Sequence, residues 1–188
     1  MTTLMATDLE KAREYFAFTR GRLVEVTSGL TDAQARFKPA ANCWSIADIL
    51  DHLVTVHQRV MTRLVEQFPH APAPEPGRDS QTVDALVLEK IPDRSIKAKA
   101  PEFVLPKGLL PPTEALDSIF RSYERLTEFL ESRPDLREHV MDSPPLRAVT
   151  DGACSTADGY QWALTAAAHV ERHVRQILEL KAAPDYPA

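Results

Sequence analysis

The sequence from Pro69 to Pro112 is PHAPAPEPGRDSQTVDALVLEKIPDRSIKAKAPEFVLPKGLLPP, and it holds nine of the 15 prolines in the chain. Proline fixes its own φ angle and lacks a backbone N–H donor, so this stretch cannot form a long helix or a central strand. We predict that residues 69–112 form a long crossover between two elements, with one short helical turn around Val83–Leu88.

Apolar residues recur at the helical period of 3.6 on both sides of this crossover. Thr7–Glu10 and Thr31–Gln34 fit capping boxes, and the second box opens a short helical piece. No strand is predicted. The pattern predicts four long helices, at about Asp8–Ser28, from just after Ser45 to Phe68, at about Glu114–Glu131 and at about Ala157–Lys181.

Four helices of this length predict an all-α four-helix bundle. A short connection makes neighbouring helices antiparallel, whereas a crossover of about 44 residues lets the second and third helices run parallel. The chain of 188 residues suits one domain, spanning residues 1–188, in which the crossover is residues 69–112.

Composition excludes several classes of protein. Hydrophobic residues make up 44% of the chain, which is enough for a core, and no apolar run approaches the roughly 20 residues needed to cross a bilayer. The N-terminal residues show no secretory signal. The net charge of -5 and the scattered Lys and Arg argue against a nucleic-acid partner. Cys43 and Cys154 lie far apart, as suits a reducing compartment, so we expect a soluble, cytoplasmic protein.

His169 and His173 are four residues apart on a predicted helix, so their imidazoles share one face and can bind one metal ion. They lie on the shoulder of the apolar stripe. Glu171 lies about 200° from His169 around the helix, so it cannot act as a zincin-type base, and we expect a surface pair with Arg175. The alternative is a pair of histidines packed at the edge of the core.

A third ligand would have to come from another helix, and the second helix offers two candidates. His57 falls within the apolar stripe, and His52 lies on its shoulder, where it matches the offset of the pair on the fourth helix. The two are about 140° apart, so they cannot both point at one ion. Periodicity leaves the choice between His52 and His57 open.

Three segments resemble the DinB/YfiT-like metalloenzyme superfamily. The first, Trp44-Ser45-Ile46-Ala47-Asp48-Ile49-Leu50-Asp51-His52-Leu53, resembles its Trp-Ser-x-x-(Glu/Asp)-x-Leu-x-His-Leu signature. The second comprises Asp158-Gly159-Tyr160-Gln161-Trp162 and Ala167–Ile177, which resemble its last helix with His-x-x-x-His. The third is Asp93–Lys97 with Ala100-Pro101-Glu102. In contrast, Leu146–Cys154 matches no pattern of the family, so the resemblance does not carry over a substrate.

The resemblance implies an up-down-down-up bundle and a divalent ion, nickel or zinc, held by His52, His169 and His173. It also implies a homodimer. Some members of the family resemble thiol S-transferases, which use the metal to activate a low-molecular-weight thiol. Many others are loosely called metal-dependent hydrolases.

The remaining candidates have structural interpretations. Trp44 is expected to pack on Ile49 as a hydrophobic staple, and Trp162 to lie in the core. We expect Asp48 to support the first turn of its helix, and Asp51 to be solvated. His70 and His139 are expected in solvated loops, and Cys43 is expected to be packed. Cys154 would lie just before the N-terminus of the fourth helix, which would lower the pKa of its thiol.

Two functions follow from these observations. The first is a metal-dependent transferase or hydrolase that acts on a small-molecule substrate, with the ion activating a small thiol or water. The second is a non-catalytic helical domain with a remnant or structural histidine site. Neither function involves nucleic acid or a membrane. Because ligand imidazoles must be neutral, metal binding should weaken as the pH falls through about 6.5.

Overall fold

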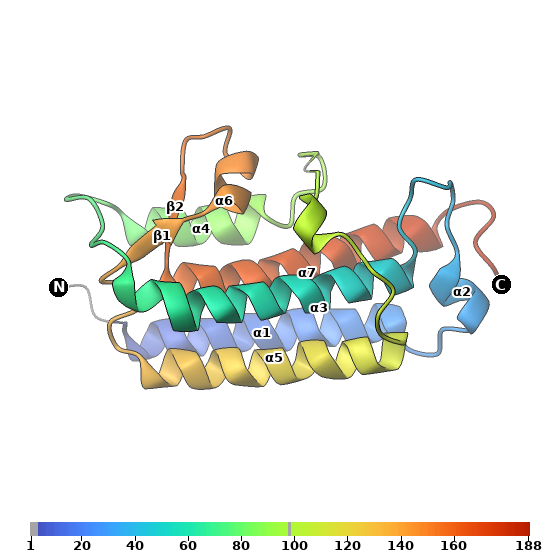
Figure 1. The fold of residues 1–188 in the computed structure, drawn as a ribbon, viewed down its shortest axis with the longest axis horizontal. Coiled ribbons are helices and arrows are strands. Elements are labelled where there is room, and N and C mark those ends of the chain that lie inside the picture. The colour runs from blue at the N-terminus through green and yellow to red at the C-terminus, as the bar shows by residue number, and fades with distance from the viewer. Residues whose placement is uncertain (1–3, 98) are drawn as a thin grey trace.

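Four long helices lie side by side in the computed structural model of the protein, which describes residues 4–97 and 99–188 (Figure 1). α1 packs chiefly on α7, and α3 on α5. α1 and α7 run in one direction and α3 and α5 in the other, which confirms the predicted up-down-down-up four-helix bundle. The four helices are α1 (Ala6–Thr27), α3 (Ile46–Thr62), α5 (Pro112–Ser132) and α7 (Gly159–Lys181).

The start of α3 follows from its sequence. The Ser45 hydroxyl accepts the N–H of Asp48 at 3.1 Å, and the Asp48 carboxylate accepts the N–H of Ser45 at 2.9 Å, so Asp48 supports the first turn as predicted. The helix buries its apolar stripe in the core of the bundle. It continues through a π-helical turn, η1 (Arg63–Gln67), and a 3-10 turn, η2 (Phe68–His70).

The connection from Ala71 to Pro111 contains α4 (Ser80–Lys90) and a 3-10 turn, η3 (Glu102–Val104). The prediction of one short turn around Val83–Leu88 is therefore wrong. No proline lies between Pro76 and Pro92, and Asp79 caps α4 by accepting the N–H groups of its first turn. α4 packs on α7 and buries two of its valines, which stabilises a helix that is too short to persist alone.

Two short strands contradict the prediction that the chain has none. β1 (Val140–Asp142) and β2 (Thr156–Asp158) pair antiparallel, and α6 (Pro144–Val149) lies between them in sequence. Three residues are too few to show an alternating pattern in the sequence. Because β2 occupies residues 156–158, α7 begins at Gly159, two residues later than predicted.

The helix starts near the N-terminus show one error and one success. α1 begins at Ala6 with Met5 as its cap, and Asp8 accepts the N–H of Met5 at 3.4 Å, so the predicted box at Thr7–Glu10 is wrong. Thr31 and Gln34 form the predicted box at the start of α2 (Asp32–Arg36). Residues 1–3, which belong to the segment where no secretory signal is predicted, lie outside the described residues.

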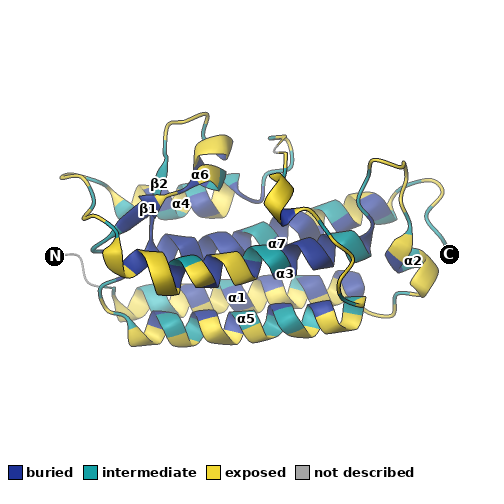
Figure 2. Cartoon of the chain, in the orientation of Figure 1, coloured by how far each residue is buried: buried dark blue, intermediate teal, exposed yellow. Residues whose placement is uncertain are grey.

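Burial is greatest in α7 (Figure 2). Its first ten residues are all buried, because α1, α3 and α4 pack around it and β2 leads directly into it. Within residues 4–97 and 99–188, no helix combines the length and apolar character needed to cross a membrane. Because α3 packs on α7, the bundle places the histidines of α7 next to α3.

Candidate metal centre

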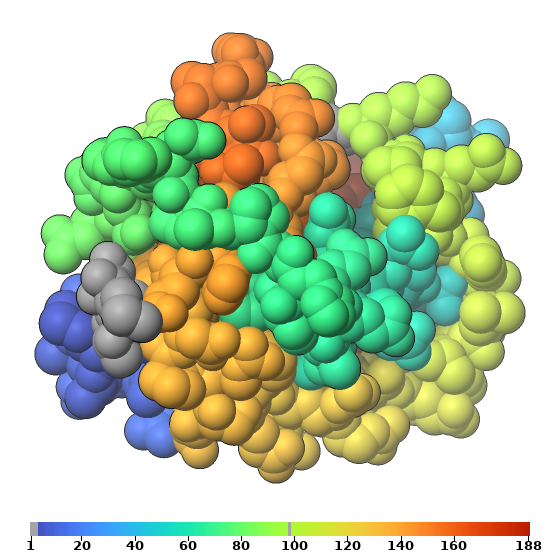
Figure 3. All heavy atoms as spheres, turned by 60° about the vertical axis from the view of Figure 1, so that its left-hand side comes forward, coloured from blue at the N-terminus to red at the C-terminus, as the bar shows by residue number. Residues whose placement is uncertain are grey.

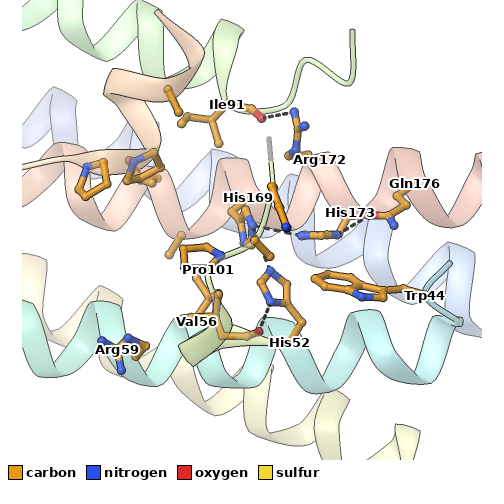
Figure 4. Close-up of a pocket in the computed structure, with 18 of the residues that line it drawn as sticks. Trp44, His52, Val56, Arg59, Ile91, Pro101, His169, Arg172, His173 and Gln176 are labelled. Atoms are coloured by element: carbon orange, nitrogen blue, oxygen red, sulfur yellow. Dashed lines mark hydrogen bonds between the residues drawn. The ribbon is translucent and has the colours of Figure 1, made fainter. Parts of the chain in front are cut away.

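Three of the six histidines converge between α3 and α7 (Figure 4). The Nε2 atom of His169 lies 3.1 Å from Nε2 of His173 and 3.4 Å from Nε2 of His52. The candidate ligand atoms of the three residues all lie within 4.8 Å of one another. No Asp, Glu or Cys among the described residues joins this group. The structure thus brings together the three histidines that the resemblance selected.

Hydrogen bonds on the far side of two rings fix which nitrogen faces the others. His52 Nδ1 lies 2.6 Å from the carbonyl oxygen of Val104, and His173 Nδ1 lies 2.8 Å from Oε1 of Gln176. Both oxygens accept, so each Nδ1 carries the proton and donates it. The Nε2 atoms of His52 and His173 are therefore left with lone pairs that face His169.

Without an ion, this arrangement leaves polar atoms unsatisfied. His169 can donate one proton from Nε2 to only one of its two neighbours, and its buried Nδ1 has no partner among the described residues. Crowded Nε2 lone pairs that face one another are costly in a buried site, and an ion bound at the three Nε2 atoms would relieve that cost. The donor set fits a divalent ion, because imidazole nitrogens are common metal ligands and two of the three rings, those of His52 and His173, have the second hydrogen bond at Nδ1 that orients such ligands.

Burial keeps these rings neutral. It lowers the pKa of His52, and it lowers the pKa of His169 and His173 well below the ordinary value of 6.5. A positive charge on His173 or His52 would lower the pKa of His169 further, and one on His52 would do the same for His173. Neutral imidazole is the form that binds metal. Protons should therefore compete with a metal only below the pH of about 6.5 expected from the sequence.

Trp44 forms one wall of the site. Its ring centroid lies 4.8 Å from that of His52, and it stacks on His173 at 6.2 Å with an angle of 19° between the planes. The expected role of Trp44 was a staple at the start of α3. The structure places the indole against two of the three imidazoles, where it restricts their orientation.

Asp51 is not solvated, so that prediction is wrong. The residue is 3% exposed, and its carboxylate accepts the backbone N–H groups of Lys107 at 2.6 Å, Gly108 at 3.0 Å and Leu109 at 3.3 Å. Gly108 has a φ of +67°, which glycine adopts without strain. Asp51 therefore ties the end of the crossover to α3, next to His52 and close to the Val104 carbonyl that orients it.

His57, the other candidate on α3, lies outside this group of histidines. It is buried in the core, with Nδ1 3.0 Å from the hydroxyl of Ser122 on α5 and its ring against Tyr123. Burial lowers the pKa of His57 from 6.5 to about 4. His57 points toward α5, and His52 points toward α7.

Two further histidines lie away from the centre. His70 is exposed, as predicted. His139 is half-buried and donates from Nδ1 to the carbonyl oxygen of Ala71 at 2.7 Å, so the prediction of a solvated His139 is wrong. Its partner lies 68 positions earlier in the chain, which no local pattern reveals.

Glu171 does pair with Arg175, at 3.0 Å, but it is buried rather than on the surface. Its other oxygen lies 3.5 Å from Nε of Arg22 on α1. Because α1 covers this face of α7, Glu171, which lies between the two histidines in sequence, faces away from them, as its angular position requires. Glu171 therefore cannot serve the site as a base.

Neither cysteine joins the histidines. Cys154 is half-buried, and β2 separates it from the N-terminus of α7, so it does not lie at that helix end as predicted. Cys43 is half-buried beside Trp44 and lines the pocket into which the three histidines open. Trp162 is buried, as predicted, and lines the same pocket.

The three histidines open into a pocket of about 960 Å³. Residues of α3, α6, α7 and the crossover line it. Figure 3 shows the corresponding recess, in which α7 lies at the floor between α6, α3 and the crossover near residue 105. The volume is typical of small-molecule sites, and the candidate metal centre lies within reach of a ligand in it.

The chain is similar to known proteins in sequence and in fold. A sequence profile of the DinB superfamily matches residues 15–177, which include all three histidines. The chain belongs to the DinB superfamily. This DinB superfamily protein is 28% identical over 155 residues to YuaE of Bacillus subtilis strain 168, described as uncharacterized, and the match covers 81% of the chain and 86% of YuaE.

The fold of this DinB superfamily member is similar to the solved structure of YfiT from Bacillus subtilis. The TM-score is 0.56 with 14% sequence identity, and the match covers 96% of this chain and 90% of YfiT. YfiT is described as a probable metal-dependent hydrolase with an unusual four-helix bundle topology. The similarity confirms the fold class predicted from the sequence.

Proposed function

We propose that this protein is a divalent-metal-dependent enzyme whose ion is held by Nε2 of His52, His169 and His173. The observation that carries the proposal is the convergence of these three atoms, with the Nε2 lone pairs of His52 and His173 directed inward by hydrogen bonds to Val104 and Gln176. Nickel and zinc are the candidate ions.

The surroundings favour catalysis over a purely structural site. Structural zinc sites are closed by four protein ligands, whereas catalytic sites keep an open position. Here three ligands face a pocket of about 960 Å³. When bound, the ion would supply a Lewis acid that lowers the pKa of a coordinated water or thiol.

The residues around the pocket favour thiol activation over hydrolysis assisted by a general base. Glu179, the only carboxylate among the lining residues, is paired with Arg94 at 2.7 Å. Asp51 faces away and is occupied by the crossover. The described residues that line the pocket therefore offer no unpaired carboxylate that could take a proton from water. A small thiol that loses its proton to solvent is the preferred nucleophile.

The metal site is tested by titrating zinc and nickel into protein stripped with a chelator. The wild type should bind one equivalent, and His52→Ala, His169→Ala and His173→Ala should each weaken binding by about 100-fold or more. His70→Ala, which changes an exposed histidine, is the matched control and should bind like the wild type. Equal affinity in all five proteins would overturn the assignment.

The chemistry is tested on the metal-loaded protein. Conjugation of cysteine or glutathione to a chloroaromatic electrophile forms a carbon–sulfur bond, with loss of chloride to solvent. Hydrolysis of a nitrophenyl ester is the competing assay. Turnover in the first assay that is lost in His169→Ala would support thiol transfer, and turnover in the second alone would establish a hydrolase. Metal binding without turnover in either assay would favour the structural alternative.

A further inference from the structure

The pocket that holds the histidines is strongly positive, although the chain as a whole is negative. Its lining includes five cationic side chains and a single carboxylate, that of Glu179, whereas the net charge of the chain is -5. The five cations are Arg59, Arg63, Arg94, Lys99 and Arg172. Such a concentration of one sign in a concave site attracts ligands of the opposite sign.

Two of the four arginines have guanidinium groups that form neither an ion pair nor a hydrogen bond with any described residue. Arg94 pairs with Glu179, and Arg172 donates to backbone carbonyl oxygens of the crossover, including that of Ile96 at 2.7 Å. Arg59 and Arg63, in contrast, form no ion pair with any carboxylate of residues 4–97 and 99–188. Nε of Arg63 is buried and has no hydrogen-bond acceptor among the described residues.

Aromatic rings hold both arginines in place. The Arg59 guanidinium lies 4.2 Å from the ring centroid of Phe103, and that of Arg63 lies 4.7 Å from the ring of Trp162. Stacking on a ring occupies the face of a guanidinium and leaves its N–H edge free, and that edge matches the oxygens of a carboxylate or phosphate.

The arginines lie at a defined distance from the metal ligands. His52, Val56 and Arg59 follow one another at helical spacing on the face of α3 that lines the pocket, and Arg63, the first residue of η1, continues this row. In Figure 4, Trp44 and the three histidines lie at one end of the pocket and Arg59 at the other, with Val56 between them. A rise of 1.5 Å per residue separates His52 from Arg59 by about 10 Å and from Arg63 by about 16 Å along the helix.

We propose that Arg59 and Arg63 form an anion subsite, so that the substrate is an elongated organic anion. Its carboxylate or phosphate would bind the two guanidinium groups, and an apolar body about 10 Å long would lie along Val56 and Ala166. The opposite end would reach the histidines. The direction in which the ligand lies rests on the proposed function, whereas the anion subsite itself does not.

The test is calorimetric titration of metal-free protein with octanoate, octyl phosphate and the neutral octanamide. The wild type should bind one or both anions about tenfold more tightly than the amide, and the preferred anion identifies the chemistry of the head group. The double variant Arg59→Met/Arg63→Met, which keeps the apolar stems, should lose this preference and keep its affinity for octanamide. Arg125→Met, which removes an exposed arginine of α5, is the matched control and should keep the preference.

Three results would overturn the subsite: equal affinity for octanoate, octyl phosphate and octanamide in the wild type, a preference that survives in the double variant, or a preference that appears only after zinc is added. If the double variant fails to fold, the exposed Arg59→Met alone should still reduce the preference about threefold. Zinc titration of the same proteins separates the two proposals. An anion preference in protein that binds neither zinc nor nickel would leave the subsite standing and refute the proposed function.

Discussion

Asp51→Asn should loosen the crossover and destabilise the protein. The carboxylate of Asp51 accepts three backbone N–H groups, two at one oxygen and one at the other. Asparagine has the same shape but keeps only one accepting oxygen, and its NH₂ group would face at least one of the three donors. The segment Lys107–Leu109 would therefore lose one or two of its charge-assisted bonds.

The structure allows an estimate of the cost. A hydrogen bond to a charged group contributes about 1.5–3 kcal/mol. Lys107, Gly108 and Leu109 are exposed, so water can replace part of what is lost. The expected decrease in the free energy of unfolding is thus about 2 kcal/mol rather than the full value of two bonds. Because Val104 lies in the same segment, the carbonyl that orients His52 should also become less well held.

Two measurements check this prediction. Urea unfolding at pH 7 gives the free energy of the variant and of Asp117→Asn, a control that changes an exposed aspartate of α5. Limited trypsin digestion follows cleavage after Lys107, which should be faster in Asp51→Asn if the segment detaches locally before global unfolding. If Asp51→Asn unfolds within about 0.5 kcal/mol of the wild type and is cleaved at the same rate, the anchoring role of Asp51 is incorrect.

Three further changes test other parts of the structure. The pKa of His57 is lowered to about 4 on folding, so as the pH falls the unfolded state binds a proton before the folded state does. The stability of the folded protein that depends on neutral His57 is therefore complete above pH 6.5 and is lost as the pH falls to 4. Between pH 7 and pH 4, metal-free His57→Leu should therefore gain about 3 kcal/mol relative to the wild type in urea unfolding, and parallel pH curves would contradict this. Gln176→Ala removes the acceptor of His173 Nδ1 and should weaken zinc binding about tenfold with little change in melting temperature, whereas unchanged affinity would show that Gln176 does not orient the ring. In Gly159→Ala, the added Cβ would lie 2.5 Å from Cδ2 of Leu136 and 3.0 Å from Cε2 of Phe68, so the free energy of unfolding should fall by about 1–3 kcal/mol, and a variant as stable as the wild type would mean that these side chains move without cost.

The bundle and its connectivity could be predicted from local patterns. Helical periodicity depends on residues within one or two turns, and the proline cluster acts on the backbone of its own segment, so neither needs knowledge of distant contacts. The shared helix face of His169 and His173 could also be predicted from local sequence, because residues four apart on a helix always share a face. The family resemblance added His52, which periodicity alone could not separate from His57.

What the sequence could not show depends on partners far away in the chain. Asp51 looked like a surface residue because its three donors lie 56 to 58 positions later. The strands β1 and β2 are each three residues long and are stabilised by pairing across an intervening helix, so neither has a pattern of its own. α4 forms between two groups of prolines because it packs on α7, which covers its valines.

The chemistry of the pocket shows the same division. The sequence gives the identities of the histidines and arginines, and their spacing gives their positions on helix faces. The meeting of Nε2 atoms from α3 and α7, the bond from His52 to Val104 and the stacking of Arg63 on Trp162 require packing between helices and a crossover. These contacts set burial, and burial determines which imidazoles are neutral and which cations lack a partner.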